Sequence, residues 1–295
     1  MIIGDDRVRV IKNIEKAVAK GDWSAKVEVG DPVLSLDERK NLVNNFWAEQ
    51  STFKGKTNDK LGHLLFNTLT RVLTSDTTFT GLENLNDLPD GGAIITANHF
   101  NQIDSLPIKH LANKTHHHLA IAIEDTNLKL PGILSYLMNY VGTIPLIKSP
   151  SYIGTEFPKH LHDELAKNNW VLIFPEQEMW WNYRKPRKLQ RGAYYFAAQQ
   201  NVPIVSTFVE LQEKDKLEKD HPNFYQTKYI VHVLPTIYPD VKLSANENSK
   251  KMLAQDYQQK VKAFEEAYHR ELDPTFTPWD IAGWRYDYQN SKTKK

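Results

Sequence analysis

A histidine and an aspartate stand five positions apart where a strand is expected to turn into a helix. His99 follows the apolar run of residues 93–97, which predicts a short buried strand. Asp104 precedes residues 105–111, where Pro107 suits a first helical turn because that turn does not need its backbone N–H. We therefore expect both side chains at a strand-to-helix corner, where they can project into a cleft.

The spacing of His99 and Asp104 allows acid–base chemistry. Residues five apart on one continuous helix face different directions, but a turn between them can bring the carboxylate to the imidazole. An aspartate bonded to one ring nitrogen fixes the tautomer of a histidine and leaves the other nitrogen as a base. Such a base can deprotonate a substrate hydroxyl without a serine nucleophile. The alternative is structural, with Asp104 as a helix cap and His99 as a satisfied core residue.

Four short blocks resemble, in order, the signatures of the glycerolipid acyltransferase family, which includes the 1-acylglycerol-3-phosphate acyltransferases. Residues 98–104 resemble the first block, N-H-x-x-x-x-D, and residues 142–148 resemble the second, G-x-I-P-x-x-R. Residues 174–177 resemble the third, F-P-E-G, and residues 202–206 resemble the fourth, V-P-I-V-P. The resemblance covers roughly residues 60–240. Four blocks in order are far more specific than any one of them.

Three positions depart from the family pattern. Lys148 stands in place of arginine, which keeps the charge and loses the bidentate fork. Gln177 stands in place of glycine and puts a side chain where the family often has none, which can alter the acceptor pocket. Ser206 stands in place of the last proline of the fourth block.

The resemblance implies acyl transfer from acyl-CoA or acyl carrier protein to a lysophospholipid hydroxyl, with lysophosphatidate as the expected acceptor. It implies His99 as the general base and Asp104 as the group that orients it. No cofactor or metal is expected, because a thioester is already activated. Lys148 would bind the phosphate of the acceptor, and Glu176 would hold an acceptor hydroxyl. The expected substrate-binding residues are Lys148, Glu176, Asn98, Gly142, Arg184, Arg187 and Arg191.

Residues 178–191 combine aromatic side chains with five cations. In one interpretation the cations receive phosphates of the acceptor or of the acyl carrier. Trp180, Trp181 and Tyr183 would then lie at the bilayer interface or line an acyl groove. In the other, this is a surface loop anchored by its tryptophans.

The composition excludes several classes of protein. The chain has 295 residues, a formal net charge of +1 and no cysteine. Disulfides, thiolate zinc sites and a cysteine nucleophile are therefore excluded, and no global field favours nucleic acid. Residues 1–6 lack the basic-then-apolar order of a signal peptide. The three consecutive histidines at 116–118 lack metal-ligand spacing, and we expect the exposed start of a strand there.

Two stretches bear on membrane association. Residues 130–147 carry no charge, but their prolines and glycines favour a buried helix (133–140) and strand (143–147) over a transmembrane helix. Residues 7–20 predict a basic amphipathic helix, which either attaches to an anionic bilayer or packs on the domain. With the resemblance, we expect a cytoplasmic protein held peripherally at the inner face of the cell membrane.

The pattern of elements predicts an α/β fold: a three-layer core with a mixed, mostly parallel sheet of about seven strands flanked by helices, plus N-terminal helices. We expect a polar linker at 51–58, which divides an N-terminal helical segment (1–58) from a catalytic domain (59–295). The strands are expected at 77–80, 93–97, 118–123, 143–147, 169–174, 203–211 and 228–237, with a charged loop between the last two. Further helices are expected at 59–73 and 251–272.

Two other functions remain open at this point. The same histidine and aspartate could act on water, which would make the protein a thioester hydrolase. The departures at Lys148, Gln177 and Ser206 also leave room for a catalytically silent lipid-binding protein on the same fold.

Overall fold

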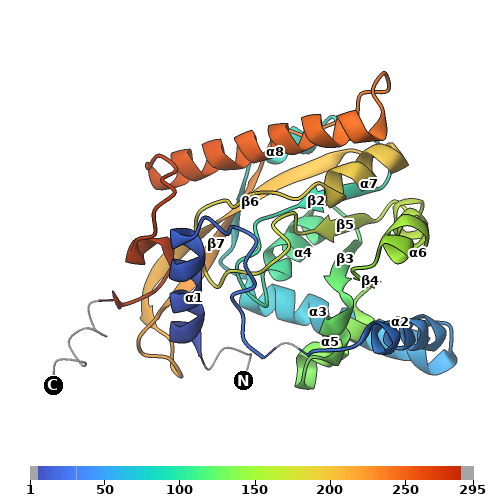
Figure 1. Cartoon of the computed structure of the whole chain (residues 1–295), viewed down its shortest axis with the longest axis horizontal. Helices are drawn as coiled ribbons and strands as arrows, with labels where there is room; N and C mark the ends of the chain where they lie inside the picture. The colour runs from blue at the N-terminus through green and yellow to red at the C-terminus, as the bar shows by residue number, and fades with distance from the viewer. Residues whose placement is uncertain (1–5, 31, 287–295) are drawn as a thin grey trace.

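The computed structural model describes residues 6–30 and 32–286 (Figure 1). Within these ranges one sheet has seven strands in the order β1-β7-β6-β2-β5-β3-β4. Every neighbouring pair is parallel except β6 and β7, which are antiparallel. The strands are β1 (Thr78–Thr80), β2 (Ala93–Thr96), β3 (Leu119–Glu124), β4 (Thr143–Leu146), β5 (Trp170–Ile173), β6 (Ile204–Leu217) and β7 (Tyr225–Val233). The predicted mixed, mostly parallel sheet is confirmed.

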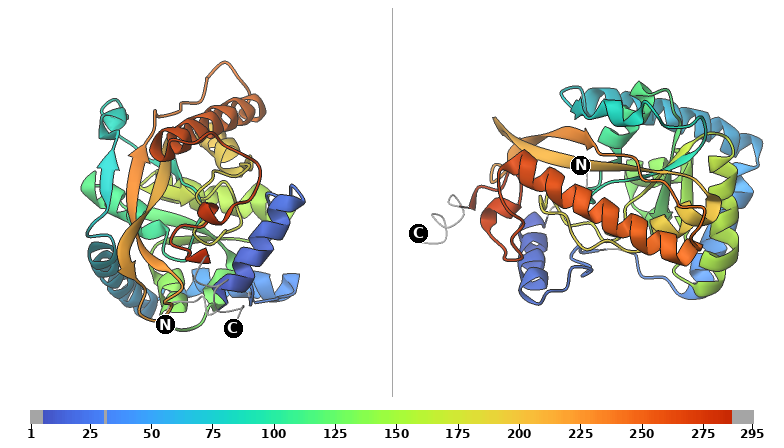
Figure 2. Two further views of the ribbon diagram at one scale, coloured as in Figure 1. Left: turned by 90° about the vertical axis from the view of Figure 1, so that its left-hand side faces the viewer. Right: turned by 90° about the horizontal axis from the view of Figure 1, so that it is seen from above.

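Helices cover both faces of the sheet because successive strand residues point to opposite sides. In β2, Ile95 packs with residues of α2 to α5, whereas Ile94 packs with residues of α6 to α8. Figure 2 shows α8 along one face and α3 on the opposite side, which makes three layers. The helices are α1 (Arg7–Ala19), α2 (Leu36–Gln50), α3 (Phe53–Leu73), α4 (Ser105–Lys114), α5 (Gly132–Tyr140), α6 (Pro150–Leu165), α7 (Gly192–Gln200) and α8 (Ala245–Tyr268). Three short 3-10 turns complete the elements: η1 (Leu82–Leu85), η2 (Asp125–Lys129) and η3 (Pro278–Asp280).

The polar linker predicted at 51–58 is wrong. Helix α3 begins at Phe53, and the side chain of Thr52 caps it by accepting a hydrogen bond from the backbone N–H of Gly55. Polar residues are common on the solvent-exposed face of a helix. The many polar residues at 51–58 therefore do not require a gap between helices. The division of the chain near residue 58 falls inside α3 and stays a prediction.

The prediction of a charged loop between the last two strands is also wrong for much of this segment. Residues 212–217 continue β6, which pairs with β7 as a long antiparallel ribbon. Side chains of this extension are mostly exposed, so charged residues fit a strand there. The last helix likewise starts earlier than predicted, at Ala245, where Ser244 and Glu247 form a capping box.

Helix α1 packs on the domain, which was one of the two interpretations of this basic segment. The side chains of Ile11, Ile14 and Val18 are buried in a cluster with Trp180 and Trp181. Figure 1 shows α1 near β7 and the C-terminal segment, apart from α2 and α3. The apolar face of α1 is therefore covered by protein.

Residues 130–147 form the helix α5 and the strand β4, as predicted. In the described part of the chain, we find no helix whose length and hydropathy would let it cross a membrane. The ring of His117 stacks on Trp170 at 4.2 Å, while His116 and His118 are exposed.

Candidate active site

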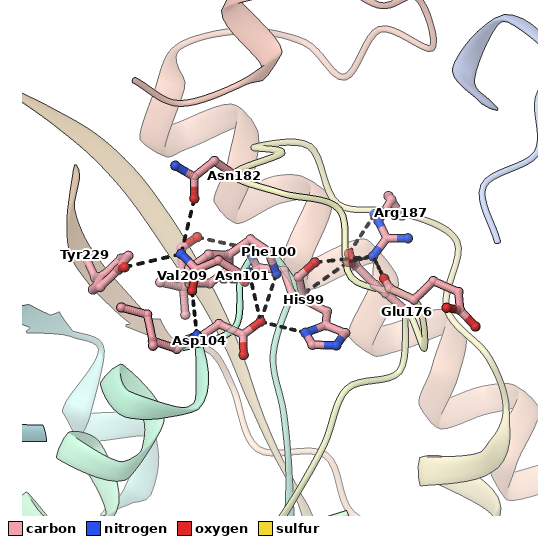
Figure 3. A network of polar contacts seen from close by, with 12 residues as sticks. His99, Phe100, Asn101, Asp104, Glu176, Asn182, Arg187, Val209 and Tyr229 are labelled. Atoms are coloured by element: carbon pink, nitrogen blue, oxygen red, sulfur yellow. Dashed lines mark hydrogen bonds and ion pairs between the residues drawn. The ribbon is translucent and has the colours of Figure 1, made fainter. Parts of the chain in front are cut away.

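The corner between β2 and α4 brings His99 and Asp104 together. Nδ1 of His99 lies 2.6 Å from Oδ2 of Asp104 (Figure 3). The same carboxylate oxygen accepts the backbone N–H of Phe100 at 2.9 Å and of Asn101 at 3.4 Å. Asp104 precedes α4 without making a side-chain cap bond, because its carboxylate is directed back to the loop. The alternative in which Asp104 serves as a helix cap is therefore wrong.

The imidazole of His99 is held on one side and open on another. Its ring stacks on Phe174, with centroids 4.2 Å apart and planes 13° from parallel. The side chain keeps 22% of its surface exposed, against 4% for Asp104. A carboxylate only accepts hydrogen bonds, so Nδ1 carries the proton and Nε2 is the basic nitrogen. The pair thus has the geometry that base catalysis requires.

A cavity of about 300 Å³ opens beside this pair. It lies where β2, β3, β4 and β5 end, the edge at which parallel sheets place ligands. His99, Asp104 and Lys148 are the predicted site residues that line it. Its apolar wall is built by Ile121, Ile123, Leu130, Leu134, Met138, Leu146, Phe157, Ile173, Phe174 and Phe196.

Glu176 and Arg187 form a buried ion pair that holds the backbone of His99. The Glu176 carboxylate accepts the N–H of His99 at 3.1 Å and the Arg187 guanidinium at 2.8 Å (Figure 3). The carbonyl of His99 accepts the N–H of Trp180 at 3.1 Å. Burial lowers the pKa of Arg187, although Glu176 opposes this shift. Glu176 does not line the cavity, so its placement gives no support to the predicted contact with an acceptor hydroxyl.

Arg187→Lys is expected to lower kcat about tenfold with little change in KM, because lysine keeps the charge but loses the planar fork that holds Glu176 against His99. Steady-state kinetics and a melting curve check this. Arg71→Lys, on the exposed face of α3, is the matched control. A selective rise in KM would instead assign this pair to substrate binding.

Lys148 follows β4 and reaches the cavity between two carboxylates. Its Nζ lies 3.1 Å from Oε2 of Glu124 and 3.2 Å from Oε1 of Glu178. Burial alone would lower the pKa of Lys148, but Glu124 and Glu178 outweigh it and the pKa is raised. Burial alone would raise the pKa of Glu124, but Lys148 and Arg39 outweigh it and that pKa is lowered. Lys148 and Glu124 are therefore charged at neutral pH.

Four other predicted substrate-binding residues do not line the cavity. The amide of Asn98 exchanges two hydrogen bonds with the backbone of Val209, at 3.0 and 2.8 Å. Gly142 has φ +72°, a conformation that favours glycine, before β4 begins. Arg184 pairs with Glu213 at 2.6 Å, and Arg191 bonds to Ser249 at 2.7 Å. Their roles in substrate binding stay predictions that these placements do not support.

The aromatic residues of the 178–191 segment are buried. Trp180, Trp181 and Tyr183 pack against α1, and Nε1 of Trp180 donates to the carbonyl of Ala25 at 2.9 Å. They anchor packing, as in one of the two interpretations, and they are not at a surface that could meet a bilayer. The segment is also more enclosed than a surface loop, because the C-terminal residues pack over it.

The sequence interpretation missed the two carboxylates around Lys148. Glu124 is the last residue of β3, which lies next to the strand that leads to Phe174. Ligand groups gather at the ends of parallel strands, so this position is a sequence signal for a residue of the site. Glu178 lies directly after the third block, where Gln177 adopts φ +64° and sends its side chain to the cavity wall. Gln177 thus keeps the left-handed backbone that glycine adopts readily.

Part of the chain matches a known protein family. Residues 76–210 match the family model described as Acyltransferase. This match covers less than half of the 295-residue chain. All four signature blocks lie inside the matched residues.

One solved structure that aligns with the chain is the 1-acyl-sn-glycerophosphate (LPA) acyltransferase PlsC from Thermotoga maritima. The two chains are 16% identical, and the alignment covers 90% of this chain and 96% of the other with a TM-score of 0.45. No curated protein matches the chain.

Proposed function

We propose that the protein transfers a fatty acyl group from a thioester donor to the hydroxyl of a lysophospholipid. The donor is acyl-CoA or acyl carrier protein. The observation that carries the proposal is the 2.6 Å contact between His99 and Asp104 at the wall of a cavity, within the residues that match the Acyltransferase family model. No residue of the chain needs to become acylated in this reaction.

The proposed reaction uses His99 twice. Nε2 accepts the proton of the acceptor hydroxyl as its oxygen attacks the thioester carbonyl. The tetrahedral intermediate then collapses, the carbon–sulfur bond breaks, and the imidazolium returns the proton to the leaving thiolate. Asp104 keeps Nδ1–H in place and stabilises the imidazolium between these steps.

The apolar part of the cavity supports a lipid substrate. Leu134, Met138 and Leu146 give this wall the aliphatic surface that a fatty acyl chain can bury. Because lysophospholipids reside in bilayers, we propose that the enzyme works peripherally at the inner face of the cell membrane. The N-terminal segment (1–58) and catalytic domain (59–295) remain our proposed division of the chain.

Radiolabelled acyl donor is expected to yield diacylated phospholipid only when purified protein and a lysophospholipid are both present. The label follows the acyl group because the hydroxyl of the acceptor replaces the thiol. Thin-layer chromatography of the lipids checks this for acyl-CoA and acyl carrier protein donors separately. Free fatty acid at the same rate with and without lysolipid would make the protein a thioester hydrolase. No conversion of any donor would make it a silent lipid-binding protein.

A further inference from the structure

Carboxylates line the end of the cavity next to Lys148, where we place the head group of the acceptor. Beyond the His99–Asp104 pair, the charged side chains that line it among the described residues are Glu28, Glu124, Glu178 and Lys148. Glu124 and Glu178 both contact Lys148, and Glu124 also pairs with Arg39 at 2.6 Å. A phosphate monoester carries a charge of about −1.5 to −2 at pH 7. Such a group would lie close to the carboxylates of Glu124 and Glu178 as well as to the ammonium of Lys148.

Lys148 is already neutralised by its neighbours. Its Nζ contacts Glu124 and Glu178 at nearly equal distances, 3.1 and 3.2 Å. Glu178 is 18% exposed and Glu124 22% exposed, so bulk water screens these contacts only in part. A phosphate at Lys148 would therefore have to compete with two carboxylates for one point charge.

Arg39 and Lys26 compensate part of the charge of Glu124, but both act from outside the cavity lining. Arg39 contacts Glu124 at 2.6 Å and Asp125 at 3.4 Å from outside the cavity wall. The guanidinium groups of Arg184, Arg187 and Arg191 are engaged elsewhere, and none lines the cavity. Lys26 acts on Glu124 but is exposed and also lies outside the lining.

We propose that Glu178, together with Glu124, selects acceptors whose head group carries an ammonium over acceptors that end in a phosphate monoester. The ammonium lies against the two carboxylates, and Lys148 contacts the anionic part of the same head group. A zwitterionic lysolipid meets both signs of charge at this end of the cavity. The choice is made partly by repulsion of the dianion, which is how a site rejects a close analogue. This inference rests on the proposed acyl transfer and refines its acceptor.

The test is a competition between lysolipids with the same acyl chain, presented in mixed micelles of a neutral detergent to full-length protein. Lysophosphatidylethanolamine offers an ammonium, lysophosphatidylglycerol offers the same phosphodiester without it, and lysophosphatidate offers the monoester. We expect kcat/KM to fall in that order, with about a tenfold or larger difference between the first and the last. The order in the unmodified protein tests the preference itself, and a variant then tests the role of Glu178.

Glu178→Gln removes the charge and nearly keeps the shape of this side chain. It is expected to lower the ratio of kcat/KM for the ammonium acceptor to that for the monoester by about tenfold. Glu156→Gln is the matched control, because Glu156 pairs with Lys159 at 3.1 Å on the surface of α6, away from the cavity. Melting curves compare the folding of both variants with that of the parent.

The outcomes separate this inference from the proposed function. A preference for lysophosphatidate, equal use of lysophosphatidylglycerol and lysophosphatidylethanolamine, or an unchanged ratio in Glu178→Gln overturns the inference and leaves acyl transfer standing. Acylation of none of the lysolipids with either donor overturns the proposed function and the inference with it.

Discussion

His99→Ala is expected to lower kcat by about 10²–10⁴-fold, the usual contribution of a positioned general base. The fold should persist, because the imidazole is partly exposed and the Asp104 carboxylate keeps its bond to the N–H of Phe100 at 2.9 Å. Single-turnover transfer of labelled acyl groups measures the chemical step, and circular dichroism measures the fold. KM for the acceptor should change little, since the base acts mainly in the transition state.

One control variant and one further test variant accompany this experiment. His162→Ala removes an exposed histidine of α6 that contacts Gln200, and it should keep full activity. Asp104→Asn keeps the shape of the pair but replaces an acceptor-only group, so Nδ1 can lose its proton and the wrong tautomer can form. A large loss is expected there too. Unchanged turnover in His99→Ala would remove this residue from the mechanism.

The corner that holds His99 could be predicted because its information is local. An apolar run of strand length ends at residue 97, and Pro107 fits the first turn of the helix that follows. The family resemblance then supplied the expected roles. The direction of the Asp104 carboxylate could not be derived from the sequence, because the same residue type at a helix start also caps helices. Only the loop conformation of residues 97–104 distinguishes the two.

The environment of residues 178–191 could not be predicted, because its partners are remote in sequence. Lys185 bonds to Asp280 at 2.9 Å, and Trp180 bonds to the carbonyl of Ala25. A run of aromatic and basic residues is equally consistent with a surface that binds ligands and with an interior held by distant carboxylates. The carboxylates at this end of the cavity were missed for the same reason, since Glu124, Lys148 and Glu178 come from three different segments of the chain.

The serine in the fourth block has a structural partner that the sequence did not reveal. The Oγ of Ser206 donates to Asp256, which lies in α8. The same carboxylate accepts a hydrogen bond from the hydroxyl of Tyr194. It accepts another from the hydroxyl of Thr96, at 2.9 Å. Lys260, one turn further along α8, contacts it at 2.6 Å. All five side chains are buried, so a proline at 206 would remove one donor from a closed network.

Asp256→Ala is expected to lower the free energy of unfolding by about 3–5 kcal/mol, because it leaves the Lys260 ammonium buried without its counter-ion. Both side chains have no exposed surface, and burial already lowers the pKa of Lys260 against the opposing effect of Asp256. Urea unfolding followed by fluorescence measures the change. Activity need not fall in proportion, since none of the five side chains of this network lines the cavity.

The same helix supplies the control for Asp256. Glu266→Ala breaks an exposed pair with Lys262 at the same four-residue spacing, and it should leave stability nearly unchanged. Asp256→Leu combined with Lys260→Met removes both charges and should cost less than Asp256→Ala, because no uncompensated ion remains. If the double variant is instead the less stable of the two, the bonds of Lys260 to the hydroxyl groups of Thr96 and Ser206 contribute more than its missing counter-ion costs. The network would then be held mainly by its hydrogen bonds.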